Sequence, residues 1–232
     1  APVHYSEPMC SEVYVMIAII ADDHPLFRVA LAQASSAILG NDALLLQAQT
    51  MEQVWPLLRQ HPDTHFIFLD LKMPGSDGFT GLSALRTEYP DVPVIMVSAE
   101  EDPVIIKQAL ALGAAAYIPK SVPLELLSDA ISAVLNGDSW LPPGLADDVK
   151  NAKPLIDNDF AQRLEQLTPQ QFRVLKMIAD GLLNKQIAYE MNVQETTIKQ
   201  HVSAILRKLN VNNRTLAGIM FEKLRLPESY TG

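Results

Sequence analysis

The first part of the chain alternates short apolar runs with amphipathic stretches of helical length. The apolar runs predict five strands, at residues 14–21, 44–49, 66–69, 94–98 and 115–118. Helical patterns between and after them predict five helices, at residues 26–39, 51–59, 81–88, 103–112 and 124–135. Strict alternation of strand and helix is typical of βαβ units, and right-handed crossovers leave few possible orders for the sheet. The pattern therefore predicts an α/β domain, a flavodoxin-like five-stranded parallel sheet of order 2-1-3-4-5.

The pattern changes after residue 137, where the hydrophobic periodicity is lost. A Pro-Pro-Gly sequence at 142–144 and the polar stretch after it predict a linker at residues 142–165. Thr168, with Pro169 after it and Gln171 three residues on, then signals the capped start of a helix.

Two further helices are expected in this second part. Asn184 is expected to cap a short one, and a longer one is expected at 195–209. The inward stripe of the longer helix is Ile198, Val202, Ile205 and Leu209, and its outward face carries Thr196, Lys199, Gln200, Ser203, Arg207 and Lys208. Two helices joined by a tight turn, the second one basic on its free side, predict an all-α helix-turn-helix domain.

Charge divides the chain at the same place. The net charge of −9 combines −12 up to residue 158, from 8 Lys and Arg against 20 Asp and Glu, with +3 after it, from 10 against 7. We therefore expect an N-terminal extension at 1–13, an α/β domain at 14–141, the linker, and a basic-faced helical domain at 166–232. No apolar run is long enough for a membrane span, and the single cysteine, Cys10, excludes an internal disulfide. These features predict a soluble cytoplasmic protein with no membrane partner.

Charged and hydroxyl side chains come at the ends of four predicted strands. Asp22 and Asp23 follow the first strand, Asp70 ends the third, Ser98 ends the fourth, and Lys120 follows the fifth. Because the carboxyl ends of parallel strands meet at one edge of a sheet, these side chains are expected to lie together. Three crowded carboxylates favour a hard divalent cation, Mg²⁺ above all. Lys120 and Ser98 then suit a phosphoryl group held by the metal, and Asp70 is the expected nucleophile.

These motifs resemble those of a known family. The sequences IIADDHPLFRVAL, FLDLKMPGSDG, VIMVSA and AAYIPK resemble the receiver domain of two-component response regulators, whose fold is CheY-like. The sequence LTPQQFRVLKMIADGLLNKQIAYEMNVQETTIKQHVSAILRKLNVNNRT resembles the LuxR-type helix-turn-helix. Together they are similar to a NarL/FixJ-type transcriptional regulator over about residues 14 to 220. In that reading the domain at 14–141 is the receiver.

The resemblance implies a role for each residue at the strand ends. Asp70 is the phospho-acceptor, charged by a cognate histidine kinase. The implied Mg²⁺ ligands are Asp23 directly, Asp22 mostly through water, Asp70, and the backbone carbonyl of Lys72. Ser98 stands at the family's hydroxyl position, Lys120 at its phosphate-pairing lysine, and Tyr117 at its aromatic switch position. From the residues alone, Tyr117 is rather a half-buried strand tyrosine.

The helix at 195–209 is expected to enter the major groove of double-stranded promoter DNA. Base contacts are expected from Lys199, Gln200 and Ser203, which match base-contacting positions of the family. Phosphate contact or docking is expected from Thr197, His201, Asn184, Lys185 and Lys208. His201 fits packing against the first helix of the domain equally well.

A homodimer on paired half-sites is expected, because one copy offers few cations to neutralise phosphates. The resemblance implies that the apolar-rich segment 216–224 is the dimer surface. From the residues alone, the segment fits the core of the domain equally well. Two residues depart from the family pattern: Gln171 replaces a Glu near the start of the first helix, and Gln194 replaces a capping Ser before the recognition helix. Loss of such a cap costs about 0.5 to 2 kcal/mol.

Other functions fit the residues less well. A haloacid-dehalogenase-type phosphatase needs a second acid two residues after its nucleophile, where this chain has Lys72, and a P-loop hydrolase needs a GxxxxGK[ST] motif that the chain lacks. A LuxR-type sensor of a small signal molecule has no need for the acids, hydroxyl and lysine at the strand ends. The complete set also argues against a receiver that no longer uses phosphate. We therefore expect a response regulator, not an enzyme apart from its own phosphoryl transfer and dephosphorylation.

Overall fold

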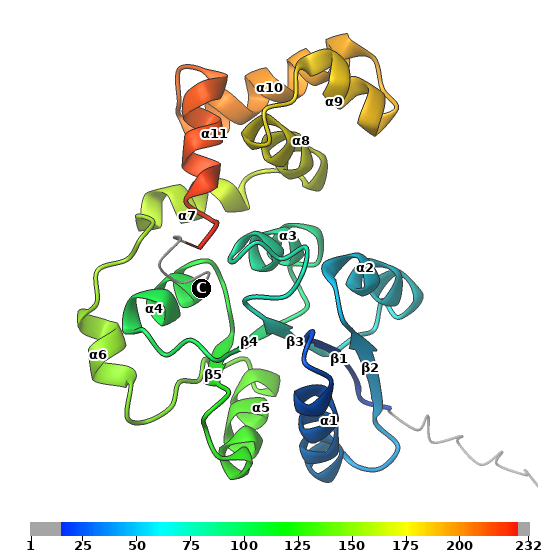
Figure 1. Ribbon diagram of the computed structural model, residues 1–232, viewed down its shortest axis with the longest axis vertical. Helices are drawn as coiled ribbons and strands as arrows, with labels where there is room; N and C mark the ends of the chain where they lie inside the picture. The colour runs from blue at the N-terminus through cyan, green and yellow to red at the C-terminus, as the bar shows by residue number, and fades with distance from the viewer. Residues whose placement is uncertain (1–14, 227–232) are drawn as a thin grey trace, which may run out of the picture.

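The computed structural model describes residues 15–226 and contains the predicted parallel sheet (Figure 1). Its strands are β1 (Ile17–Ala21), β2 (Leu44–Ala48), β3 (Phe66–Asp70), β4 (Val94–Ser98) and β5 (Ala116–Pro119). They pair in parallel in the order β2-β1-β3-β4-β5, with Ile19 level with Leu46 and Ile67. The predicted fold class and strand order are confirmed. The expected strand start at Tyr14 lies outside the described residues.

Helices cover both faces of the sheet (Figure 1). One face carries α1 (Pro25–Leu39) and α5 (Leu127–Leu135), which follows a short 3-10 turn, η1 (Leu124–Leu126). The other face carries α2 (Met51–Gln60), α3 (Thr80–Glu88) and α4 (Pro103–Ala111). Because both faces are covered, β1, β3 and β4 are buried along their whole length, which is why they read as unbroken apolar runs.

The C-terminal part is a separate helical domain above the α2–α3–α4 face (Figure 1). It consists of α8 (Pro169–Ala179), α9 (Asn184–Met191), α10 (Glu195–Leu209) and α11 (Arg214–Glu222). The capping box predicted for α8 is present, because the Thr168 hydroxyl accepts the Gln171 backbone N–H and the side-chain Oε1 of Gln171 accepts the Thr168 backbone N–H. The inward stripe of α10 is also confirmed, with Ile198, Ile205 and Leu209 buried and Val202 packed against them.

The segment at 142–165, predicted to be a linker, contains two short helices that the sequence pattern did not indicate, α6 (Ala146–Asn151) and α7 (Asn158–Glu165). Its place as the linker between the two domains stays a prediction. Helix α7 buries Phe160 and Leu164 in the core, so tertiary packing stabilises a helix too short to stand out in the sequence. The expectation that Asn184 caps α9 is wrong: Leu183 is the N-cap residue, and the side-chain Oδ1 of Asn184 accepts a hydrogen bond from Arg214 instead.

Candidate functional site

The carboxyl ends of β1, β3 and β5 bring three charged side chains together. Asp22 and Asp70 are each only 2% exposed, and Lys120 lies between them. The Lys120 Nζ is 2.6 Å from Asp22 Oδ2 and 3.1 Å from Asp70 Oδ2. The parallel register brings them together although they come from positions far apart in the chain, as the sequence predicted.

Negative charge in this group exceeds positive charge. Burial raises the pKa of the Asp70 carboxyl above its usual value, the nearby Asp22 carboxylate raises it further, and Lys120 offsets part of the shift. A raised pKa means that the folded protein disfavours the ionised form of Asp70. A cation placed beside Asp70 would therefore stabilise its carboxylate.

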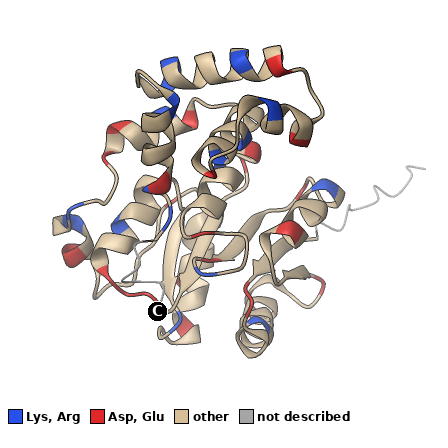
Figure 2. Ribbon diagram, turned by 45° about the horizontal axis from the view of Figure 1, so that its top comes forward, with Lys and Arg blue, Asp and Glu red and all other residues tan. Residues whose placement is uncertain are grey.

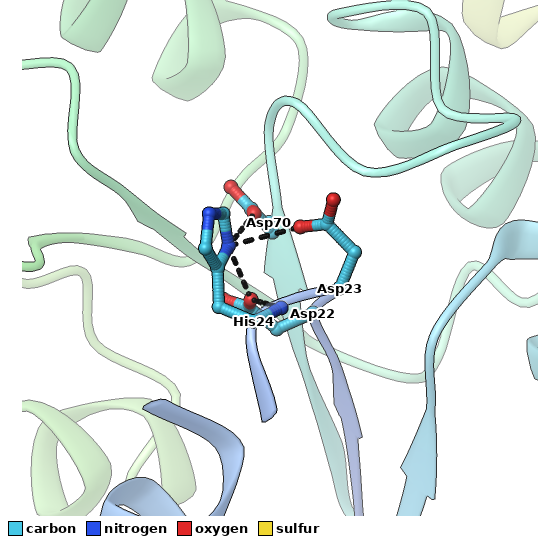
Figure 3. A group of neighbouring side chains, drawn as sticks. All are labelled: Asp22, Asp23, His24 and Asp70. Carbon is cyan, nitrogen blue, oxygen red and sulfur yellow. Dashed lines mark hydrogen bonds and ion pairs between the residues drawn. The ribbon is translucent and has the colours of Figure 1, made fainter. Parts of the chain in front are cut away.

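Asp23 and His24 complete the group at its exposed side (Figure 3). The His24 Nδ1 lies 2.9 Å from Asp23 Oδ1 and 3.0 Å from Asp22 Oδ1. Ligand atoms of Asp22, Asp23, His24 and Asp70 all lie within 4.8 Å of one another. This donor set, mostly carboxylate oxygen, fits a hard divalent cation.

The loop after β3 borders the group. The Lys72 N–H donates to Asp70 Oδ1 at 3.3 Å, while the Lys72 side chain is exposed. The Lys72 backbone is thus next to Asp70, which is what a carbonyl ligand from this residue requires.

Ser98 and Tyr117 are both buried in the sheet beside the acidic group. The Ser98 hydroxyl accepts the Glu100 N–H at 3.1 Å, and the Tyr117 hydroxyl donates to the Glu100 carbonyl at 2.8 Å. Tyr117 is 0% exposed, and its burial raises the pKa of the phenol well above the usual value. The tyrosine is therefore fully buried, not half-buried, and both side chains hold the same loop between β4 and α4.

Sequence reasoning missed three residues that surround the acids. His24 is among the possible ligands, the Phe27 ring lies 4.7 Å from Lys120 Nζ, and the buried Arg28 donates to the Asp22 backbone carbonyl at 2.6 Å. His24 could have been found from its position directly after the two acids. Phe27 and Arg28 carry no such signal, because only the turn of α1 brings them to the site.

The second candidate site is the outward face of α10. Lys199, Gln200 and Ser203 are exposed there, and Thr197 and His201 are partly exposed. Figure 2 shows Lys and Arg on the helices of this domain. Lys199 has only a loose ion pair, 3.5 Å from Glu195, with both side chains well exposed. The face is therefore free to meet a polyanion.

The remaining predicted DNA-contacting residues lie at the edge of this face or away from it. Lys185 is exposed on α9. Asn184 is bonded to Arg214, and the Lys208 Nζ donates to Gln171 Oε1 at 2.7 Å. Asn184 and Lys208 thus have partners inside the domain.

Comparisons with known proteins follow the same division. Residues 18–132 match the response regulator receiver domain, and residues 165–221 match the bacterial regulatory proteins of the luxR family. The glycerol metabolism activator of Pseudomonas putida is 42% identical over 204 residues, covering 86% of this chain and 91% of the relative. The chain belongs to the NarL/FixJ-type response regulators.

Other relatives and solved structures agree with this family. The nitrate/nitrite response regulator NarL of Escherichia coli is 29% identical over 212 residues, which cover 90% of this chain and 95% of NarL. A structure of the response regulator RcsB of Salmonella typhimurium has a TM-score of 0.55 at 23% identity, covering 90% of the regulator and 98% of RcsB, which supports the fold. By its family, this chain is thus a DNA-binding transcriptional regulator.

The two domains of the regulator touch at the loop that follows Asp70. The Phe79 N–H donates to the Leu224 carbonyl at 2.8 Å, just beyond α11. Gly78 has a φ of +70°, and a Cβ there would lie 2.7 Å from the Leu226 nitrogen. An ion pair between Glu88 of α3 and Arg173 of α8 adds a second contact. The C-terminal domain therefore packs against the same loop that borders the acidic group.

The segment between the domains is held on α4. The Lys107 Nζ donates to the carbonyls of Lys150 and Ala152 at 2.8 and 2.6 Å, and the Ile156 N–H donates to Gln108 Oε1 at 2.6 Å. These bonds attach the end of α6 and the segment after it to α4, which follows the loop that Ser98 and Tyr117 hold.

No helix within residues 15–226 is long and apolar enough to cross a membrane. The expected cytoplasmic location stays a prediction.

Proposed function

We propose that Asp70 accepts a phosphoryl group from a cognate histidine kinase, and that phosphorylation controls dimerisation and sequence-specific binding to promoter DNA. The observation that carries this proposal is the buried Asp70 carboxylate with Lys120 Nζ at 3.1 Å, in a chain that also presents the exposed basic face of α10. The first feature suits phosphoryl chemistry, and the second suits a nucleic acid.

Asp70 is the nucleophile in this proposal. A carboxylate oxygen of Asp70 forms a bond to phosphorus while the P–N bond of the kinase phosphohistidine breaks. The electron pair of that bond goes to the imidazole nitrogen, which takes up a proton. Lys120 then pairs with the phosphoryl oxygens, since its Nζ already lies within reach of Asp70. The same residues serve dephosphorylation by water, and we propose no further enzymatic activity.

Mg²⁺ is the proposed cofactor, held by Asp23, Asp70 and the Lys72 carbonyl, with Asp22 acting mostly through water. When bound, the ion neutralises negative charge on the carboxylates and on the phosphoryl group. Its fit is supported by the raised pKa of Asp70, which burial and then the Asp22 carboxylate cause and which Lys120 only partly offsets. It is also supported by the ligand atoms of Asp22, Asp23 and Asp70, which lie within 4.8 Å of one another. Asp22 has a further role of its own, which is to hold Lys120 at 2.6 Å.

The proposed switch begins at Ser98 and Tyr117. When the Ser98 hydroxyl turns to a phosphoryl group on Asp70, it gives up the Glu100 N–H that it now accepts. Tyr117 also bonds Glu100, so the loop before α4 rearranges as one unit. Because α4 holds the interdomain segment through Lys107 and Gln108, a shift of α4 changes how the C-terminal domain docks.

The DNA site is proposed on α10. Lys199, Gln200 and Ser203 meet base edges, and Thr197, His201 and Lys185 are proposed to position the helix on the backbone phosphates. Asn184 and Lys208 contribute once they exchange their present partners for phosphates. For the homodimer on DNA, α11 offers Leu216 and Ile219, which are 42% and 54% exposed.

The test measures DNA affinity and particle size with and without beryllofluoride, a phosphoryl mimic. The DNA is a duplex that the full-length protein selects from a random pool. We expect the mimic to raise affinity and to produce dimers, and we expect Asp70→Asn to abolish both responses. The matched control is Asp77→Asn, an exposed acid in the same loop, which should respond as the parent does. A normal response in Asp70→Asn contradicts the proposal.

A further inference from the structure

A cleft between the two domains plays no part in the proposed function. Side chains of α2 and α3 of the receiver and of α8 of the C-terminal domain line it, and its volume is about 480 Å³ (Figure 1). Sites for small molecules have volumes of about 300 to 1,000 Å³ and often lie between domains. The cleft therefore has the size and the position of a small-molecule site.

Two aromatic side chains that line the cleft are fixed by neighbouring rings. Trp55 stacks on Tyr89, with 6.4 Å between the ring centroids and 22° between the ring planes. Phe172 is only 3% exposed and packs edge-on against Phe221, with the centroids 5.6 Å apart. Rings that are already held in place lose little freedom when a ligand packs on them. The cleft thus offers a preformed surface to a flat apolar group.

The charged side chains around the cleft leave an excess of positive charge. The basic ones are Arg59, Arg173 and Lys176, and the acidic ones are Glu52 and Glu88. Arg173 forms an ion pair with Glu88, whereas Arg59 and Lys176 form none with any residue in 15–226. Lys176 is also partly buried, so solvent screens its charge less than that of an exposed lysine. A ligand with one negative charge would balance the charges that surround it.

We propose that this cleft binds a small organic anion in which a flat apolar ring carries one carboxylate or a similar anionic group. The ring packs on Trp55 and Phe172, and the anionic group pairs with Lys176 and Arg59. Trp55 and Arg59 belong to α2, whereas Phe172 and Lys176 belong to α8. The ligand therefore contacts both domains and stabilises their present docking.

The effect of this ligand on the switch rests on the proposed function, whereas its binding does not. Phosphorylation is proposed to change how the C-terminal domain docks, so a ligand that stabilises the present docking opposes that change. Thermodynamic linkage makes the opposition reciprocal, so the bound anion lowers the affinity of the receiver for beryllofluoride. The regulator then responds to a small organic anion as well as to phosphorylation.

The test uses the two tryptophans of the chain as reporters. Trp55 lines the cleft, whereas Trp140 does not line it and bridges to Ala116 at the edge of the sheet. The full-length protein, labelled with ¹⁵N at its indoles, is titrated with naphthoate, and Trp55→Phe assigns the two indole N–H resonances. Two further probes are naphthamide, which keeps the ring without the charge, and acetate, which keeps the charge without the ring.

We expect naphthoate to shift the Trp55 resonance saturably and to leave that of Trp140 unchanged. Naphthamide and acetate should each bind about tenfold more weakly or worse. Lys176→Gln should weaken naphthoate binding about tenfold, and the more exposed Arg59→Gln about threefold. The matched control is Lys153→Gln, which removes an exposed charge that does not line the cleft and should bind naphthoate as the parent does. Circular dichroism checks that each variant folds.

Several results would overturn the inference. No saturable shift of Trp55, or equal shifts of Trp55 and Trp140, would mean that naphthoate does not occupy the cleft. Equal binding of naphthoate and naphthamide would mean that the cleft does not select an anion. Equal losses in Lys176→Gln and Lys153→Gln would trace the effect to overall charge.

The link to the switch is decided separately from binding. Saturating naphthoate should weaken beryllofluoride binding to the parent about threefold or more, and it should have less effect in Lys176→Gln. If naphthoate binds at Trp55 but beryllofluoride affinity stays the same, the link is wrong and the site stands. If beryllofluoride fails to change DNA affinity even without naphthoate, the proposed function is wrong, while the Trp55 titration still decides whether the cleft is a site.

Discussion

The two candidate sites of the regulator are built in opposite ways. At the acidic group, Asp22 and Asp70 are buried at the ends of rigid strands, and a lysine partly compensates their charge inside the protein. On α10, Lys199 is exposed and has only a loose partner one turn away. Exposed pairs of this kind contribute little to stability, about 0 to 1 kcal/mol, so the charge is available to a ligand at almost no cost.

The difference fits the two proposed roles, in which the buried group accepts a phosphoryl group and the exposed face binds DNA. Phosphoryl transfer needs groups fixed within a fraction of an ångström, which buried strand ends provide. DNA binding needs cationic side chains that replace the counter-ions condensed on the DNA phosphates, and exposed helix side chains provide them. Between them lie the loop after Asp70, α4, and the segment that joins the two domains.

The largest effect is expected from a variant that removes the proposed nucleophile of the acidic group. Asp70→Asn should abolish labelling of the full-length chain by acetyl phosphate, because an amide does not attack phosphorus at a useful rate. Labelling is followed by a phosphate-affinity gel. Asp77→Asn should label normally, and equal loss in both variants would mean that the loop and not the carboxylate is at fault.

The next largest effect is expected from a variant that removes a positive charge from the exposed face of α10. Lys199→Ala should weaken binding to the selected duplex about tenfold at low salt, and it should lower the salt slope by about one if the contact is to phosphate. Fluorescence anisotropy at several salt concentrations measures both. Lys223→Ala removes an exposed charge beside Leu224, at the end of α11 that meets the receiver, and should bind as the parent does.

A third variant tests the contact between the two regions. Gly78→Ala places a Cβ 2.7 Å from the Leu226 nitrogen, which should push the C-terminal residues off the loop. Solution X-ray scattering should then show a larger radius of gyration. Gly137→Ala is the control, since Gly137 also has positive φ, at +84°, but nothing lies within 4 Å of its added Cβ. Equal expansion in both variants would trace the effect to backbone strain.

The smallest effect is expected on the stability of the helical domain, from a change at the start of α10. The N-cap residue of α10, Gln194, makes no side-chain capping hydrogen bond, as its sequence position predicted. Gln194→Ser should therefore stabilise the helical domain by about 0.5 to 2 kcal/mol, and Gln194→Ala should not. Urea unfolding followed by circular dichroism measures the difference. No gain for serine would mean that the backbone at this position does not accept a cap.

The acids, the hydroxyl and the lysine at the strand ends could be predicted residue by residue from the sequence, although His24 was missed, whereas α10 could be predicted only as a face. Asp22, Asp70, Ser98 and Lys120 each end or follow an apolar run, and the parallel sheet determines where such ends meet. On α10, periodicity tells inward from outward, but it does not show that Lys208 bonds to Gln171.

Contacts between distant parts of the chain could not be predicted from the sequence pattern. Full burial of Tyr117 depends on packing against the α2–α3–α4 face, so the residues alone left its position open. Helix α7 forms because Phe160 and Leu164 reach a core supplied by other helices. The docking of Leu224 on Phe79 is a backbone bond, which no side-chain pattern encodes.

The central claim is that the acidic group and the DNA-binding face are energetically coupled, and reciprocity tests it most directly. Beryllofluoride affinity of the receiver is measured in the presence and absence of the selected duplex, and duplex affinity with and without beryllofluoride. Thermodynamic linkage requires the two factors to be equal, and we predict equal factors of about 5 to 150. If each ligand binds with the same affinity whether or not the other is present, the two sites are independent and the account is wrong.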